Sequence, residues 1–76
     1  MASLSPLSGQ EVVRVFEELV WRVARQRGSH IVLIKESHIA TLSIPDHTEV
    51  AKGTLRSLIR SAGLTVGEFE DTFRGL

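Results

Sequence analysis

Apolar residues recur at helical spacing near the start of the chain. Val12, Phe16 and Leu19 fall on one face of a helix, and charged residues take the other face. Ser8 and Glu11 have the spacing of a capping box, in which each side chain accepts from a backbone N–H of the first turn. The pattern therefore predicts a first helix that begins just after Ser8.

The same spacing returns in the last third of the chain. Leu55, Leu58, Ile59 and Ala62 follow one another in the order of a single helix face. Gly63 stands directly after them, where a residue in the left-handed conformation commonly ends a helix. A second long helix is therefore expected to end at this glycine.

One more, shorter helix is expected near the end of the chain. Thr65 and Glu68 repeat the capping-box spacing. Phe69 and Phe73 follow four residues apart, so they share one face of that helix.

Between the helices the pattern changes to that of strands. A first strand is expected over residues 21–26, where Arg22, Ala24 and Gln26 alternate with Trp21, Val23 and Arg25. After a turn at Gly28, the run Ile31–Ile34 is apolar on both faces, which predicts a strand buried on both sides. A tight turn over Lys35–His38 then leads into a third strand over residues 39–44, which the next proline stops.

Short links between the three strands favour an antiparallel meander. The order helix, three strands, helix and short extra helix predicts an α+β fold with helices on one face of a three-stranded antiparallel sheet. The length of 76 residues predicts a single domain over residues 1–76, in which residues 1–7 form a loose arm.

Composition argues against several function classes. The chain has no cysteine, so it has neither a disulfide framework nor a thiolate zinc site. Phosphate-loop and dinucleotide fingerprints are absent, and no cofactor is expected. No secretory signal is visible at the start and no apolar stretch has the length of a membrane span, so we expect a cytoplasmic protein without a membrane partner.

The net charge is zero, but cations gather in the middle of the chain. Residues 22–60 hold seven lysines and arginines against three acids, and the other acids lie toward the two ends. A basic middle suits an anionic ligand that meets one face of the molecule. A surface of mixed charge that favours solubility fits the same pattern equally well.

The stretch Arg25–His30 combines properties that the cleavage of a phosphodiester requires. Arg25, Arg27 or, further along the chain, Lys52 would bring the positive charge that stabilises a phosphorane. Gly28 and Ser29 leave room for the RNA backbone to come close. His30 can take the proton of an RNA 2′-OH as it attacks the adjacent phosphorus, which accelerates the reaction by about 10²–10⁴-fold. The alternative is a strand-edge histidine, hydrogen-bonded to backbone, beside an ordinary hairpin turn.

Further candidate phosphate contacts lie in the second long helix. Lys52 and Thr54 stand at its start, where free backbone N–H groups attract phosphate. Arg56 and Arg60 lie four residues apart and continue a basic stripe along one face. The alternative for these residues is a helix cap followed by a solvated face.

Two further histidines accompany His30. Together the three invite a metal site, but their spacing matches no metal motif, so no metal is expected. His47 is a secondary candidate, as the proton donor to the leaving 5′-oxygen, although a structural loop role is commoner. His38 is expected to be a hairpin residue.

Four blocks of the chain, taken together, resemble the HicA toxin family. They are Gln26-Arg27-Gly28-Ser29-His30, Pro45-Asp46-His47, Lys52-Gly53-Thr54-Leu55-Arg56 and Ala62-Gly63-Leu64. The resemblance runs from Ser8 to about Phe69. It implies a fold similar to double-stranded RNA-binding domains. It also implies the toxin of a type II toxin–antitoxin system: a metal-independent endoribonuclease that cuts messenger RNA, with its catalytic histidine at His30 and a HicB-type antitoxin as partner.

The chain departs from the family pattern in three places. Members usually carry glycine after the first helix, where Val20 stands, and because a β-branched residue is strained in the left-handed conformation we expect this helix to end differently. The turn Lys35–His38 replaces a Pro-Asp-Gly hairpin. Asp46 precedes His47 where an uncharged residue is usual, which brings negative charge near a phosphate site.

The middle strand has more apolar surface than a one-sided sheet needs. Ile31 and Leu33 share one face, and Val32 and Ile34 share the other. A partner is therefore expected on the second face, either the antitoxin or a second copy of the chain in a homo-oligomer. Trp21 is a candidate anchor for it, and a core position is its commoner role.

Two other functions stay open at the level of sequence. A non-catalytic RNA-binding module that uses Lys52, Arg56 and Arg60 would bind RNA in a salt-sensitive way without cutting it. A degenerate toxin would bind its antitoxin and have no affinity for RNA.

Overall fold

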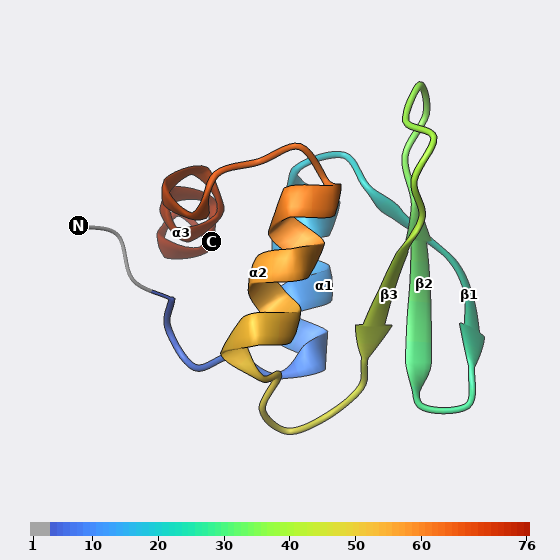
Figure 1. Ribbon diagram of the computed structural model, residues 1–76, viewed down its shortest axis with the longest axis horizontal. Coiled ribbons are helices and arrows are strands. Elements are labelled where there is room, and N and C mark those ends of the chain that lie inside the picture. Colours follow the sequence, from blue (N-terminus) through green and yellow to red (C-terminus); the bar gives the residue numbers. More distant parts are fainter. Residues whose placement is uncertain (1–3) are drawn as a thin grey trace.

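A computed structural model describes residues 4–76, and its helices and strands follow the expected order (Figure 1). They are α1 (Gly9–Glu18), β1 (Arg22–Arg27), β2 (His30–Ile34), β3 (Leu42–Pro45), α2 (Lys52–Ser61) and α3 (Val66–Arg74). The predicted α+β class, with an α-β-β-β-α order and an extra C-terminal helix, is confirmed.

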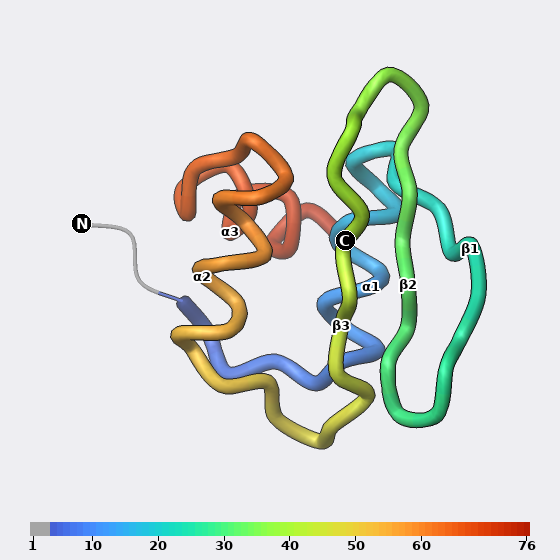
Figure 2. The backbone as a smooth tube through the Cα atoms, turned by 45° about the vertical axis from the view of Figure 1, so that its right-hand side comes forward, coloured from blue at the N-terminus to red at the C-terminus, as the bar shows by residue number. Residues whose placement is uncertain are grey.

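The three strands form one sheet in the order β1-β2-β3, and both neighbouring pairs are antiparallel, as expected for a meander. Helix α1 lies behind β2 and β3 in Figure 2, and α2 lies beside β3. The other side of the sheet, which faces the viewer in that figure, carries no helix among residues 4–76. Helix α3 packs against α1 and α2.

A single cluster of buried side chains joins the sheet to the helices. Its largest fully buried members include Phe16 of α1, Leu33 of β2, Ile44 of β3 and Phe69 of α3. The rings of Phe16 and Phe69 pack with their centroids 5.3 Å apart. No helix in the described part of the chain is long and apolar enough to cross a membrane.

The predicted helix starts are confirmed at both capping boxes. In α1 the Ser8 hydroxyl accepts from the Glu11 N–H at 3.1 Å, and the Glu11 carboxylate accepts from the Ser8 N–H at 2.9 Å. Thr65 and Glu68 make the same pair of hydrogen bonds at the start of α3, at 3.1 and 2.8 Å.

Helix α1 ends in the left-handed conformation even though Val20 occupies the position. Val20 has a φ of 66°. Its N–H donates to the Glu17 carbonyl at 3.1 Å, and the Trp21 N–H donates to the Phe16 carbonyl at 3.0 Å. These two bonds form a Schellman motif, so the expectation that this helix ends differently was wrong. The two hydrogen bonds and the burial of Trp21 hold the backbone in place despite the β-branched side chain.

Helix α2 ends in the same motif with the residue that this conformation favours. Gly63 has a φ of 77° and its N–H donates to the Arg60 carbonyl at 3.0 Å. The Leu64 N–H donates to the Ile59 carbonyl at 3.1 Å, which confirms the predicted cap. The molecule thus contains a strained and an unstrained version of one motif.

Replacing Val20 with glycine should raise the free energy of unfolding by about 1 kcal/mol. The left-handed conformation costs an ordinary L-residue about 1–2 kcal/mol, and glycine removes this cost. Glycine also raises the entropy of the unfolded chain, which offsets part of the stabilisation. The Val20 side chain is 70% exposed, so little packing is lost. Urea unfolding measures the change. Gly63→Ala, at the equivalent position, should shift the midpoint the opposite way, and a Val20→Gly variant less stable than the parent would contradict the argument.

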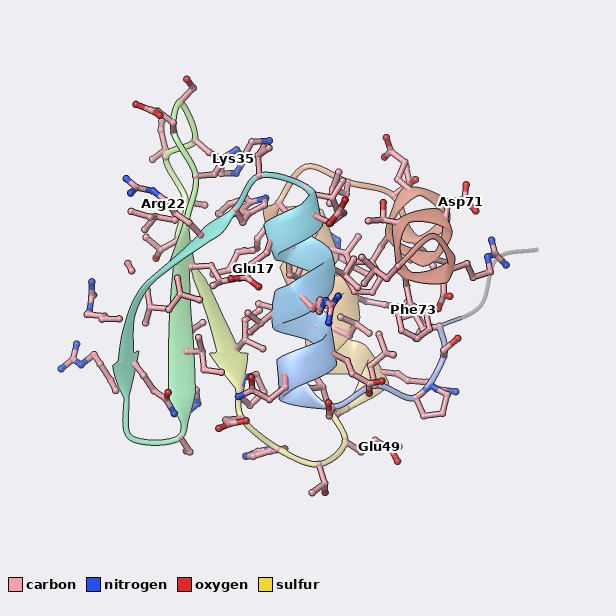
Figure 3. The ribbon with its side chains drawn as sticks, turned by 180° about the vertical axis from the view of Figure 1, so that it is seen from behind. Glu17, Arg22, Lys35, Glu49, Asp71 and Phe73 are labelled. Atoms are coloured by element: carbon pink, nitrogen blue, oxygen red, sulfur yellow. The ribbon has the colours of Figure 1, made fainter. Side chains whose placement is uncertain are left out.

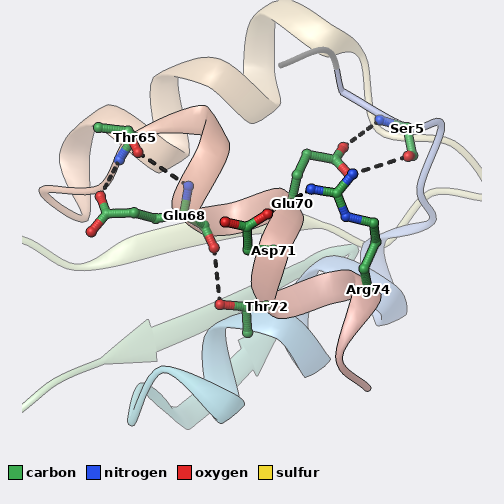
Figure 4. A network of polar contacts seen from close by, with 7 residues as sticks. All are labelled: Ser5, Thr65, Glu68, Glu70, Asp71, Thr72 and Arg74. Carbon is green, nitrogen blue, oxygen red and sulfur yellow. Dashed lines mark hydrogen bonds and ion pairs between the residues drawn. The ribbon is translucent and has the colours of Figure 1, made fainter. Parts of the chain in front are cut away.

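Residues 4–7 pack against the core, so the expected loose arm over residues 1–7 is wrong for this part, and residues 1–3 lie outside the described residues. Leu4 and Leu7 are buried. The Ser5 N–H donates to Glu70 Oε1 at 2.6 Å and its hydroxyl to Oε2 at 3.3 Å, as Figure 4 shows. The Leu7 carbonyl accepts from the Val50 N–H at 2.8 Å. Through these two leucines the segment packs on the core, although its serine and proline residues are typical of a loose arm.

The connection between β2 and β3 is longer than predicted. The expected turn is present, with the His38 N–H donating to the Lys35 carbonyl at 3.2 Å, but β3 begins only at Leu42 and not at residue 39. The His38 ring packs edge-on against Trp21 at 5.0 Å, and its Nε2 lies 2.9 Å from the Ser61 carbonyl oxygen. These contacts draw the loop toward the end of α2 and delay strand pairing.

The apolar surface on the second face of β2 is partly covered by the chain itself. Val32 is only 8% exposed and Ile34 is half-buried. Trp21 is a core residue, 2% exposed, and therefore not a free anchor in this conformation. The burial of Val32 removes the need for a partner to cover it.

Candidate functional site

The candidate catalytic residue stands at the end of a tight hairpin. Gly28 and Ser29 form the two-residue turn between β1 and β2, and Gly28 has the positive φ, 58°, that such a turn needs at its first position. The Gln26 amide donates to the Gly28 carbonyl at 3.2 Å and braces the turn. His30 follows as the first residue of β2 and is exposed.

The register of the sheet places an arginine directly opposite His30. In the antiparallel pairs, His30 stands across from Arg27 of β1 and from Pro45 of β3. Residues directly opposite in an antiparallel sheet share a face. Because the next residue, Ile31, belongs to the core, this row points away from α1. We call the side of the sheet that carries Arg27, His30 and Pro45 the helix-free face.

A bulge in β1 brings two more arginines to this face. Arg25 pairs with Val32 and Arg22 pairs with Ile34, and the register shifts between Val23 and Arg25. The extra residue, Ala24, reverses the alternation, so Arg22, Arg25 and Arg27 all lie on the side of His30. The simple alternation expected for this strand would have separated Arg22 from Arg25. All six residues of β1 are exposed.

The arginines of β1 have no acidic partner within the described residues. The ion pair found there joins Arg74 to Asp71 in α3, at 2.6 Å (Figure 4). Figure 3 shows Arg22 on β1 with its side chain directed away from α1. Guanidinium groups that are exposed and unpaired are available to an anionic ligand.

The loop after β3 lies at the same end of the molecule as His30. The Asp46 N–H donates to the Ser29 carbonyl at 2.7 Å, which ties this loop to the hairpin turn. The Asp46 carboxylate accepts from the Gln10 amide at 3.1 Å. The His47 carbonyl accepts from the Gly9 N–H at 2.8 Å, and the His47 side chain is exposed.

Gly9 is required where α1 meets this loop. A Cβ built on it would lie 2.9 Å from the Asp46 Cα and still closer to the Pro45 carbonyl oxygen. Both neighbours are backbone atoms, which cannot turn aside as a flexible side chain can. The start of α1 therefore holds the segment Pro45–His47 in its place beside the hairpin.

The candidate contacts on α2 are placed apart from the hairpin. Lys52, Thr54, Arg56 and Arg60 are all exposed, and the three cations recur every four residues along one face. The N-cap, Ala51, makes no side-chain cap bond, so the first N–H groups of α2 are open to a ligand. Within residues 4–76 no hydrogen bond or ion pair joins these side chains to those of the hairpin.

In the described part of the chain, no group of three or more His, Asp or Glu side chains is arranged to hold a metal ion. The His38 ring contacts Trp21 and the Ser61 carbonyl, so this residue of the connection between β2 and β3 also braces α2.

A family model described as the HicA toxin of bacterial toxin–antitoxin systems matches residues 9–64. The chain belongs to the HicA toxin family. It is thus related to the toxins of toxin–antitoxin systems, which act with an antitoxin partner. The match to the HicA model extends from α1 to the cap of α2 and contains every candidate site residue. No curated protein matches the chain.

The sequence-based list of site residues omitted Arg22. Simple alternation along the strand places Arg22 and Arg25 on opposite faces. The bulge that brings them to one face has no signature in the sequence of this strand. The charge of the central segment was the only signal that could have included it.

Proposed function

We propose that this HicA-family toxin is a metal-independent endoribonuclease that cleaves messenger RNA in the cytoplasm, with His30 as its proton-transfer residue. The observation that carries the proposal is the row on the helix-free face in which exposed His30 stands opposite Arg27, with Arg25 in the next row. A HicB-type antitoxin is its proposed partner.

The chemistry needs few groups because RNA supplies the nucleophile. His30 would take the proton from the 2′-OH as that oxygen bonds to phosphorus, and the bond from phosphorus to the 5′-oxygen would break. Arg27 and Arg25 would stabilise the negative charge that grows on the phosphoryl oxygens. The expected products are a 2′,3′-cyclic phosphate and a 5′-hydroxyl.

The leaving 5′-oxygen requires a proton, and His47 is the secondary candidate to donate it. Its loop is tied to the hairpin through the hydrogen bond between Asp46 and Ser29, and its side chain is exposed at the same end of the molecule. The Asp46 carboxylate, which brings negative charge near the site, accepts from the Gln10 amide, a neutral donor that orients the carboxylate and leaves its charge in place.

The candidate RNA contacts divide into two groups. Arg25, Arg27, Gly28 and Ser29 surround the scissile phosphate in this proposal. Lys52, Thr54, Arg56 and Arg60 would bind phosphates at the start and along one face of α2. Contacts of this kind give affinity without sequence choice.

Cleavage in the presence of a chelator tests the proposal directly. We expect the purified protein to cut messenger RNA with EDTA present and to leave cyclic phosphate ends. A single 2′-deoxy substitution at the cut position should abolish cleavage there, because it removes the nucleophile. A cut that persists at the deoxy position would overturn the mechanism. Salt-sensitive binding without any cleavage would support the RNA-binding module instead, and antitoxin binding without RNA affinity the degenerate toxin.

A further inference from the structure

The arginines of β1 extend well beyond the neighbourhood of His30. Arg27 stands opposite His30, Arg25 follows two residues along the strand, and Arg22 lies at the far end opposite Ile34. At about 3.3 Å per residue the row spans at most about 16 Å. A phosphate at His30 can contact Arg27, but Arg22 is too distant to act on the same phosphate.

The rest of the helix-free face offers little else to a ligand. On the β3 side of this face, the positions across β2 from Arg25 and Arg27 are uncharged. They are Ser43 and Pro45. Val32 between them is almost fully buried. The aromatic side chains Phe16, Trp21, Phe69 and Phe73 all lie in or against the core. Apart from the His30 imidazole, no aromatic ring within residues 4–76 is therefore offered to a base on this face, and the backbone of the ligand must supply most of the binding energy.

We propose that Arg27, Arg25 and Arg22 form a phosphate track that binds one extended strand of RNA, with the scissile bond at the His30 end. This inference rests on the proposed ribonuclease function. The arginines recur every two or three residues along β1, which matches the repeat of phosphates along an extended RNA strand. The bulge at Ala24 keeps Arg22 on the same face as the other two.

The track favours single-stranded RNA over a duplex. Its cations lie along one strand of the sheet, whereas a duplex presents two backbones. The attack of a 2′-OH also requires the leaving oxygen to lie in line behind phosphorus, and a flexible single strand reaches this geometry more easily than a stacked helix.

Arg22 is therefore a positioning residue whose effect depends on substrate length. It should stabilise the bound substrate and the transition state equally, because it contacts a phosphate that does not react. A substrate too short to reach it should not respond to its loss. A residue needed only for folding would affect long and short substrates alike.

The test compares Arg22→Gln with the parent on single-stranded RNA of three and of eight nucleotides. Arg14→Gln serves as the control because Arg14 is also an exposed arginine but lies on α1, away from the helix-free face. For the octamer we expect Arg22→Gln to raise KM about 5- to 10-fold with kcat unchanged. For the trimer both constants should equal those of the parent, and Arg14→Gln should change neither. An unchanged octamer KM, or an equal rise for trimer and octamer, would overturn the track.

A binding measurement separates this inference from the proposed catalysis. A 2′-O-methyl octamer lacks the nucleophile, so it reports affinity alone. Arg22→Gln should weaken its binding and lower the slope of log affinity against log salt by about 0.7, the value for one phosphate contact on a single strand. If the parent never cuts RNA but this slope changes, the track stands and the nuclease assignment fails. Tighter binding of a duplex than of the single strand would overturn the track.

Discussion

Replacing His30 with alanine should lower the rate of RNA cleavage by about 10²–10⁴-fold while the protein stays folded and keeps its affinity for RNA. The fold does not depend on this side chain, because it is exposed and Ile31 anchors the same strand in the core. The surrounding arginines remain to bind phosphate. Single-turnover cleavage measures the rate, binding to a 2′-O-methyl oligonucleotide measures the affinity, and urea unfolding checks the fold.

His38 provides a matched control for this result, and His47 tests the proposed proton donor. His38→Ala removes the contact with the Ser61 carbonyl, so it should lower stability but leave the cleavage rate of the folded protein unchanged. His47→Ala should slow cleavage if its imidazole protonates the leaving oxygen, and parental activity in this variant would show that His47 is structural. A His30→Ala variant that cuts RNA at the parental rate would sink the catalytic assignment.

Replacing Gly9 with alanine should destabilise the fold by about 3 kcal/mol, a large effect for the addition of one methyl group. The new Cβ would overlap backbone atoms of Pro45 and Asp46, so the start of α1 must move away from the loop. The hydrogen bond from the Gly9 N–H to the His47 carbonyl would be lost with it. The midpoint of urea unfolding measures the change.

Gly53→Ala is the control for the Gly9 substitution because it also places alanine in the first turn of a helix. A Cβ at Gly53 meets no atom within 4 Å. Alanine there should stabilise α2, by up to about 1 kcal/mol. A Gly9→Ala variant as stable as the parent would contradict the close packing at Gly9. If Gly53→Ala also lost stability, the loss in Gly9→Ala could not be assigned to the contact of its Cβ with Pro45 and Asp46.

The helix starts and the end of α2 could be predicted because they depend on neighbours in sequence. Ser8 with Glu11, and Thr65 with Glu68, each form a reciprocal pair within one turn, and Gly63 provides its own left-handed cap. The apolar run of β2 was equally clear. The catalytic candidate also emerged at this level, because His30 follows its hairpin turn directly.

Other features depended on contacts between distant parts of the chain. Leu4 and Leu7 are buried in the same cluster as residues of α2 and α3, which lie far along the chain. Val20 adopts a strained conformation because the hydrogen bonds around it and the burial of Trp21 outweigh its own preference. The late start of β3 follows from the contacts of His38 with Trp21 and Ser61.

By itself the sequence determined where the helices begin, where α2 ends, the order of the elements and the histidine beside the hairpin turn. Each of these rests on interactions within a few residues. Only the tertiary structure decided which face of the sheet the cations occupy. A strand changes face with every residue, so the single extra residue at Ala24 places Arg22 with Arg25 and Arg27. The pairing of β1 with β2 creates that bulge, and no local pattern in the strand announces it.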